Sequence, residues 1–217
     1  MPIRTTPLVN GQFYHIYNRG VEKRRTFEDR RCYKRFLQAV RYYQLEGPKP
    51  KFSHSFDNKL FKINYSKKIV DIISFCLMPN HFHLLIKQLK DGGTSEFISK
   101  LINSYTKFYN IKFNRVGPLF QGQFKAVLIK SDEQLIYVSR YIHLNPISSF
   151  LVKDLNKYEW SSYKEYIEGI KGFCQKEEIL GFFKDTKSYQ KFVLNQIEYA
   201  QTLEKIKHQL IDGIDEN

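Results

Sequence analysis

Cysteine is scarce in this chain of 217 residues, and its pattern excludes two classes of protein. The three cysteines, Cys32, Cys76 and Cys174, are an odd number, lie far apart and include no Cys-x-x-Cys pair. The sequence therefore indicates neither a disulfide framework nor a cysteine zinc site. Because such cysteine usage is typical of a reducing compartment, we expect a cytoplasmic protein.

Long apolar runs are also missing. No stretch approaches the roughly 18 uninterrupted apolar residues that a membrane-spanning helix requires. The first residues, MPIRTTPLVNGQFYH, have no apolar core of the kind found in signal peptides. We therefore expect a soluble protein that is not bound to a membrane.

Acidic residues are outnumbered by basic ones. The chain has 22 Asp and Glu against 35 Lys and Arg, a net charge of +13. This surplus favours a polyanionic partner, with nucleic acid first and an anionic membrane second. Hydrophobic residues at 42% and aromatic residues at 16% suffice for one folded domain, alone or with a small appendage.

Several motifs of well-known enzymes do not occur. There is no Gly-x-x-x-x-Gly-Lys loop, no Gly-x-Ser-x-Gly turn and no His-Glu-x-x-His helix. P-loop nucleotide hydrolysis, serine hydrolysis and zincin proteolysis therefore lose support. An acidic triad of the integrase type stays open, although no spacing recommends Asp71, Glu96 and Asp132.

What is present is a regular succession of strand and helix patterns. Alternating and continuous apolar segments predict strands at 12–18, 69–77, 81–87 and 124–129. Helical spacing predicts helices capped by Asp29, by Thr94 or Ser95 and by Ser131, and Pro146 should end or kink the third. A basic surface loop is expected at 49–68. The order is typical of an α+β, ferredoxin-like split βαβ fold, an antiparallel sheet with helices packed on it.

A pair of histidines could bind a metal. His81 and His83 flank Phe82 near the start of a predicted strand, and the two-residue period of a strand places both imidazoles on one face. Such a triplet also arises by chance, so a metal site needs a third ligand and a reactive partner. On the third helix, Tyr141 and Asn145 are one turn apart on one face, provided that the helix reaches Asn145. His143 projects elsewhere, and a tyrosine packed on the sheet is the commoner interpretation of Tyr141.

The strings MPNHFHLLIK (78–87) and YIHLNP (141–146) together resemble the single-tyrosine HUH transposases, in particular the REP-associated tyrosine transposases. FYHIYNRG, GPLFQGQFKAVLI and WSSY stand in the expected order, and the resemblance spans residues 12–168. It implies a catalytic domain at 1–168, followed by a helical C-terminal extension at 169–217. It also implies a transposase that nicks and rejoins single-stranded, hairpin-forming DNA through a covalent 5′-phosphotyrosine intermediate.

The resemblance implies a role for each site residue. His81 and His83 become metal ligands, Tyr141 the nucleophile and Asn145 the third ligand. Nitrogen and oxygen ligands without thiolate fit Mg²⁺ or Mn²⁺ at working concentrations, although affinity alone would rank Zn²⁺ or Cu²⁺ higher. Basic residues beside the first and fourth strands are expected to bind DNA phosphates, although a solvated loop is an equally good interpretation. These residues are Arg19, Lys23, Arg24, Arg25 and Lys125. We expect His15 to be structural or to contact DNA, more than to bind metal.

Three other functions stay open at this point. A ferredoxin-like sheet with aromatic and basic residues also describes non-catalytic modules that bind single-stranded nucleic acid. A relaxase or replication initiator would use the same HUH chemistry at another DNA site. A metallohydrolase would use the histidine pair to activate water. The resemblance allows both a monomer and a homodimer.

Overall fold

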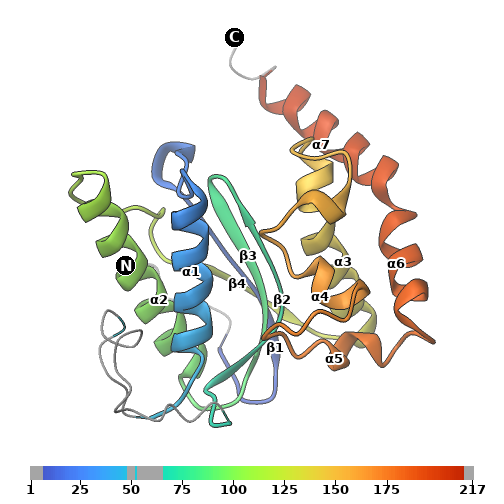
Figure 1. The fold of residues 1–217 in the computed structure, drawn as a ribbon, viewed down its shortest axis with the longest axis horizontal. Helices are drawn as coiled ribbons and strands as arrows, with labels where there is room; N and C mark the ends of the chain where they lie inside the picture. Colours follow the sequence, from blue (N-terminus) through green and yellow to red (C-terminus); the bar gives the residue numbers. More distant parts are fainter. Residues whose placement is uncertain (1–6, 48–51, 53–65, 213–217) are drawn as a thin grey trace.

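The strands form one antiparallel sheet. The computed structural model describes residues 7–47, 52 and 66–212 (Figure 1), so most of the predicted loop at 49–68 lies outside the described residues. The strands are β1 (Phe13–Arg19), β2 (Val70–Met78), β3 (His81–Gln88) and β4 (Lys125–Ile129). Their order in the sheet is β2-β3-β1-β4, and every neighbouring pair is antiparallel. This order is that of the split βαβ arrangement, so the predicted α+β fold class is confirmed.

Helices cover both faces of this sheet (Figure 1). One face carries α1 (Arg30–Tyr43) and α2 (Gly93–Lys112), and the other carries α3 (Asp132–Ser148). Short turns and helices follow: η3 (Leu155–Lys157), α4 (Tyr163–Ile167), α5 (Glu177–Leu180), α6 (Thr186–Leu194) and α7 (Ile197–Asp212), while η1 (Val21–Lys23) follows β1. Strand alternation supplies a core on each side, because Leu84 of β3 packs with α1 and α2 whereas Leu85 packs with α3.

Local capping signals set the helix starts. Asp29 accepts a hydrogen bond from the backbone N–H of Cys32, and Ser131 accepts one from Gln134, as predicted for the first and third helices. The second helix differs, because it begins at Gly93 and not at Thr94 or Ser95. A side chain at Gly93 would place its Cβ 2.5 Å from the carbonyl oxygen of Ile69, so only glycine fits this approach to the sheet.

Of the two outcomes predicted for Pro146, an end or a kink of the third helix, the first is wrong. The helix α3 continues through Pro146 to Ser148, and the N–H of Ser149 donates to the carbonyl of Asn145 over 3.0 Å. The proline lies in the last turn, so its missing N–H removes only one helical hydrogen bond. Its own carbonyl still accepts the N–H of Leu151. The helix therefore holds Asn145 in helical geometry.

The C-terminal segment is helical, and it packs on α3. Tyr189 of α6 is fully buried, with its hydroxyl 2.7 Å from Ser139 Oγ of α3. Gln201 of α7 donates from Nε2 to the carbonyl of Ile147 over 3.1 Å. These contacts bring α7 alongside the second half of α3. None of the described helices has the length and apolarity needed to cross a membrane.

Candidate active site on the α3 face of the sheet

The register of the sheet places the predicted residues on one face. Tyr17 of β1 lies opposite His83 of β3 on one side and opposite Lys125 of β4 on the other. Arg19 lies opposite His81. Because directly opposed residues of antiparallel strands point to the same face, these five side chains share the face that α3 covers.

His83 is oriented by a second histidine. Its Nδ1 lies 2.9 Å from Nε2 of His15, with the rings stacked at 24°. Burial lowers the pKa of His15 to about 4, so His15 is neutral near pH 7. His83 is itself only 5% exposed. The pair therefore shares one proton between the two facing nitrogens, and its position decides which tautomer His83 adopts.

His81 is oriented by its neighbour in the chain. Its Nδ1 lies 2.6 Å from Oδ1 of Asn80, and Nδ2 of Asn80 donates to the carbonyl of Lys23. That second bond sets the orientation of the amide, so an oxygen faces His81. An amide oxygen only accepts, so His81 carries a proton on Nδ1, and in the neutral ring the lone pair is on Nε2. The rings of His81 and His83 are perpendicular, with centroids 4.9 Å apart.

Tyr141 projects from α3 toward the histidines. Its ring centroid lies 5.5 Å from that of His83 and 5.9 Å from that of His15, in edge-on contacts. The side chain is nevertheless 52% exposed, so a substrate can reach it. Burial of part of the ring raises the pKa of Tyr141 and the charge of Glu204 adds to this effect, while the amide of Asn145 opposes it. The phenol is therefore protonated near neutral pH.

Asn145 lies one turn further along α3. It is 6% exposed, and its Nδ2 donates to the carbonyl of Tyr141 over 2.8 Å. This bond ties the amide nitrogen to the helix and leaves the amide oxygen as the atom suited to bind a cation. Among the described residues, no three His, Cys, Asp or Glu side chains form a metal-binding group. Asn145 lines the same cavity as His81 and His83, and its role as a third ligand stays a prediction.

One cavity of about 320 Å³ collects most of the predicted site. Its lining includes six predicted residues: Arg19, His81, His83, Lys125, Tyr141 and Asn145. The other predicted DNA contacts do not line it. Arg24 pairs with Glu22 at 3.3 Å, Arg25 pairs with Glu28 at 3.8 Å, and Lys23 lies exposed in the same loop. Their role in DNA binding stays a prediction.

Glu204 of α7 is a lining residue that sequence analysis missed. Within the described part of the chain, it is the only carboxylate that lines the cavity. No motif could have found it, because α7 reaches the cavity only through its packing on α3. His143, by contrast, points away from the cavity as predicted: it is fully buried and bonds to Tyr189 and Ser162. Burial lowers the pKa of His143 to about 3, which fits a neutral core residue.

Comparison with known proteins bears on this geometry. The family model described as "Transposase IS200 like" matches residues 51–145. This match includes both histidines, Tyr141 and Asn145, and it confirms the resemblance to transposases that the motifs indicated. A solved structure described as "Structure of the REP associates tyrosine transposase bound to a REP hairpin" is similar with 15% identity and a TM-score of 0.48, over 80% of this chain and 89% of that chain. No curated protein matches the chain.

Proposed function

We propose that this protein is a metal-dependent endonuclease and strand transferase that attaches single-stranded DNA covalently to Tyr141. The observation that supports this most directly is the position of the Tyr141 ring, 5.5 Å from that of His83 and in one cavity with His81 and Asn145. A hairpin-forming DNA strand is the substrate class that the resemblance implies. The match to IS200-like transposases supports the same class of function.

We propose Mg²⁺ or Mn²⁺ as the cation at working concentrations, although affinity alone would rank Zn²⁺ or Cu²⁺ higher for these donors. His81 presents Nε2 as a lone pair because Asn80 accepts its Nδ1 proton. If His83 likewise donates its Nδ1 proton to neutral His15, its Nε2 is the second ligand, and Asn145 Oδ1 is the third. Two imidazoles and one amide oxygen leave positions for phosphate oxygens. A cation bound there would neutralise charge on the phosphate during attack.

The proposed reaction exchanges one phosphate ester for another. The Tyr141 oxygen forms a bond to phosphorus, and the bond from phosphorus to the 3′ oxygen of the preceding nucleotide breaks. The phenolic proton is lost and the leaving 3′ oxygen gains a proton, so the products are a 5′-phosphotyrosine and a free 3′ hydroxyl. Attack by a 3′ hydroxyl of another strand reverses the step. Strand transfer therefore needs no external energy source.

Basic side chains at the cavity edge would hold the substrate. Arg19 and Lys125 line the cavity from adjacent strands, and both are exposed. Their charges suit the phosphates on either side of the scissile bond. Tyr141 is protonated near neutral pH, so before attack it is a phenol and not a phenolate. Catalysis therefore depends more strongly on holding the phosphate close to the Tyr141 oxygen.

The test is covalent labelling. End-labelled hairpin DNA with a single-stranded extension is incubated with the protein and Mg²⁺ or Mn²⁺, then separated on a denaturing gel. We expect a labelled protein band that disappears in Tyr141→Phe. Tyr137→Phe is the matched control, because Tyr137 lies one turn earlier on α3 and is 44% exposed.

Three results would contradict the proposal. A labelled band that persists in Tyr141→Phe would assign the nucleophile to another residue. Cleavage without any covalent band, unchanged in Tyr141→Phe, would indicate a metallohydrolase that activates water. DNA binding without cleavage under any metal would favour the non-catalytic module.

A further inference from the structure

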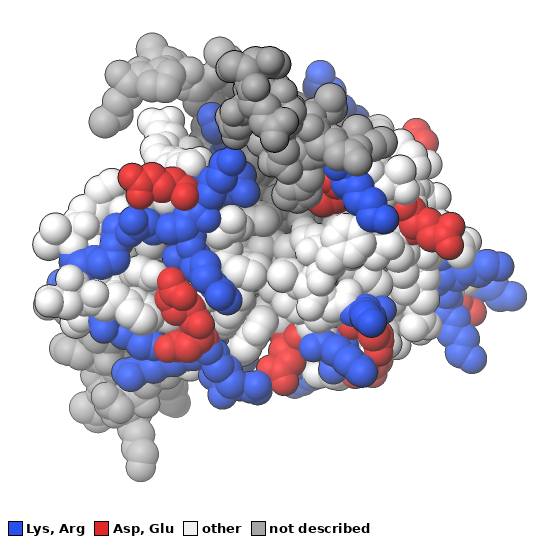
Figure 2. All heavy atoms as spheres, turned by 90° about the horizontal axis from the view of Figure 1, so that it is seen from above, with Lys and Arg blue, Asp and Glu red and all other residues white. Residues whose placement is uncertain are grey.

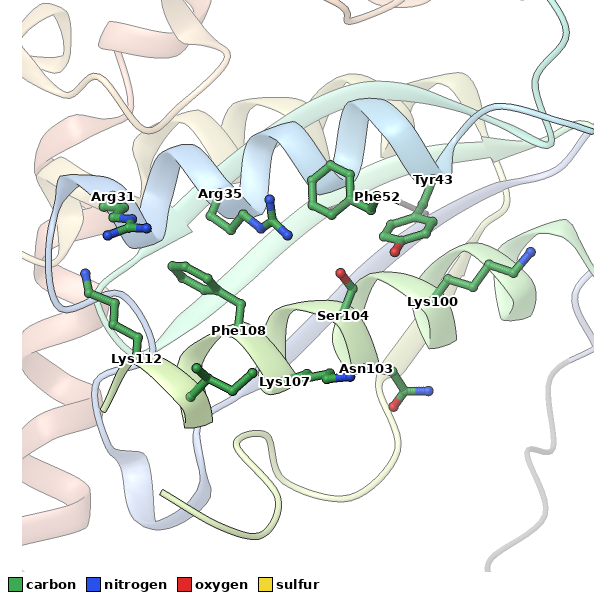
Figure 3. Close-up of a pocket in the computed structure, with 11 residues that line it drawn as sticks. Arg31, Arg35, Tyr43, Phe52, Lys100, Asn103, Ser104, Lys107, Phe108 and Lys112 are labelled. Atoms are coloured by element: carbon green, nitrogen blue, oxygen red, sulfur yellow. The ribbon is translucent and has the colours of Figure 1, made fainter. Parts of the chain in front are cut away.

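A second, larger hollow lies on the opposite side of the sheet. The groove between α1 and α2 has a volume of about 860 Å³ (Figure 3). Among the described residues, its walls carry five basic side chains and no carboxylate: Arg31 and Arg35 from α1, and Lys100, Lys107 and Lys112 from α2. The catalytic proposal uses none of these residues. We refer to this hollow as the α1–α2 groove.

Helical spacing aligns the basic side chains along the two walls. Arg31 and Arg35 are four residues apart, so they lie on one face of α1. On α2, Lys100, Ser104 and Lys107 follow the same spacing and form one stripe, with Lys100 and Lys107 about 10 Å apart along the axis. The hydroxyl of Ser104 and the amide of Asn103 add neutral hydrogen-bonding groups to this wall.

Part of this charge is available to a ligand. Lys100 pairs with Glu96 at 2.6 Å, and Lys112 pairs with Asp29 at the start of α1. Arg31 and Lys107 are both exposed, and neither forms an ion pair within the described residues. The groove therefore keeps a positive potential that an anion would neutralise.

Arg35 is held in place between aromatic rings. Its guanidinium carbon lies 4.0 Å from the ring centroid of Phe52 and 5.5 Å from that of Phe108. Burial lowers the pKa of Arg35, and the nearby charge of Arg31 acts in the same direction. A guanidinium that is already oriented loses little side-chain entropy when it binds a phosphate. Figure 3 shows Arg31 and Arg35 side by side on α1, with Phe108 of α2 opposite them.

We propose that the α1–α2 groove binds the sugar-phosphate backbone of the DNA substrate, outside the segment that is cleaved. This proposal rests on the function proposed above. A concave site with basic walls suits a polyanionic chain that enters it, whereas a flat lipid surface would not reach both walls. Figure 2 shows Lys and Arg side chains interspersed with Asp and Glu where α1 and α2 lie, at the left of that view.

The position of the groove sets a length requirement on the DNA. The catalytic cavity is on the α3 face, whereas the groove lies between the helices of the other face. A short strand that fills only the cavity would not reach the groove. A longer DNA would contact both, so groove residues should contribute to the affinity for long DNA and not for the short strand.

The experiment measures DNA binding without metal, so that no cleavage is needed. Fluorescence anisotropy is recorded across a KCl series for a short single strand, a longer single strand and a hairpin that carries the short strand. The test variant is Arg31→Ala with Lys107→Ala. The control is Lys184→Ala with Lys187→Ala, two exposed lysines near α6 that make the same change in net charge. Thermal melts verify that both variants are folded.

We expect the test variant to bind the hairpin or the long strand about 10-fold more weakly than wild type, with a salt slope smaller by about 2. The control variant should retain the affinity and the salt slope of wild type. The short strand should bind wild type and both variants with equal affinity. A loss with the hairpin alone identifies duplex phosphates as the ligand, and a loss with the long strand as well identifies single-stranded phosphates. Equal losses in test and control variants, or an unchanged salt slope, would overturn the proposal. Failure of the Tyr141 labelling assay would leave this measurement unaffected.

Discussion

The two faces of the sheet carry different kinds of polar side chain. Around the cavity on the α3 face are imidazole rings whose orientation is set by hydrogen bonds, as for His83 with His15 and His81 with Asn80, and two basic side chains, Arg19 and Lys125, line the cavity as well. The α1–α2 groove instead carries five basic side chains. Oriented imidazoles suit bond making at a phosphate, whereas cations suit holding one. The net charge of +13 therefore predicts the partner more than it predicts the site of chemistry.

The largest expected effect separates bond making at the cavity from DNA binding. His81→Ala or His83→Ala should slow covalent labelling more than about 100-fold, because each removes a proposed metal ligand. Isothermal titration with Mn²⁺ should show weaker binding for both variants. Hairpin affinity measured without metal should stay within about twofold of wild type. If Mn²⁺ affinity is unchanged, the histidines are not ligands and the distinction between the faces fails.

The next effect concerns a histidine that takes no part in the site. Burial lowers the pKa of His143 from 6.5 to about 3, so between these values the unfolded chain binds a proton that the folded protein does not. Stability from this residue is complete above pH 6.5 and is lost as the pH falls toward 3. From pH 7 to pH 4 the loss should be about 3 kcal/mol.

Urea unfolding at both pH values measures this loss, and His143→Gln should show a smaller decrease than wild type. An NMR titration provides a second measurement, since the His143 ring should not titrate above pH 4 in the folded protein. A decrease that is identical in the two proteins would contradict the assignment of His143 to the core.

A smaller effect tests whether metal binding depends on the orientation of the His83 ring. His15→Ala removes the partner of His83 Nδ1 without removing a proposed ligand. We expect Mn²⁺ affinity to fall about 10- to 100-fold, as is usual when the hydrogen-bond partner of a metal-binding histidine is lost. Titration calorimetry measures this change. An affinity equal to wild type would show that His15 is only a packing residue.

The smallest expected effect lies beside the groove. Asp29 caps α1 and also pairs with Lys112, which lines the groove. Asp29→Ala should lower the free energy of unfolding by about 1 kcal/mol through loss of the cap. Asp29→Asn should keep the cap and bind the hairpin slightly more tightly, because Lys112 loses its acidic partner. Weaker binding by Asp29→Asn would argue against phosphate in the groove.

Much of the fold could be predicted because its signals are local. The caps at Asp29 and Ser131 and the shared face of His81 and His83 follow from helical and strand periods within a few residues. The start of α2 could not be predicted, because Gly93 is required by its approach to Ile69, which belongs to another segment. Pro146 alone did not decide between an end and a kink of the third helix, and the structure shows that the helix continues through it to Ser148.

Some features of the candidate site likewise follow from local sequence, and others depend on tertiary contacts. Sequence determines which residues alternate along β3 and which lie one turn apart on α3, because both depend on backbone geometry alone. Only the tertiary structure decides that His15 meets His83, that Glu204 reaches the cavity, and that α1 and α2 bring two rows of cations to one groove. These contacts join distant segments, and the pairing of strands and the packing of apolar helix faces determine them.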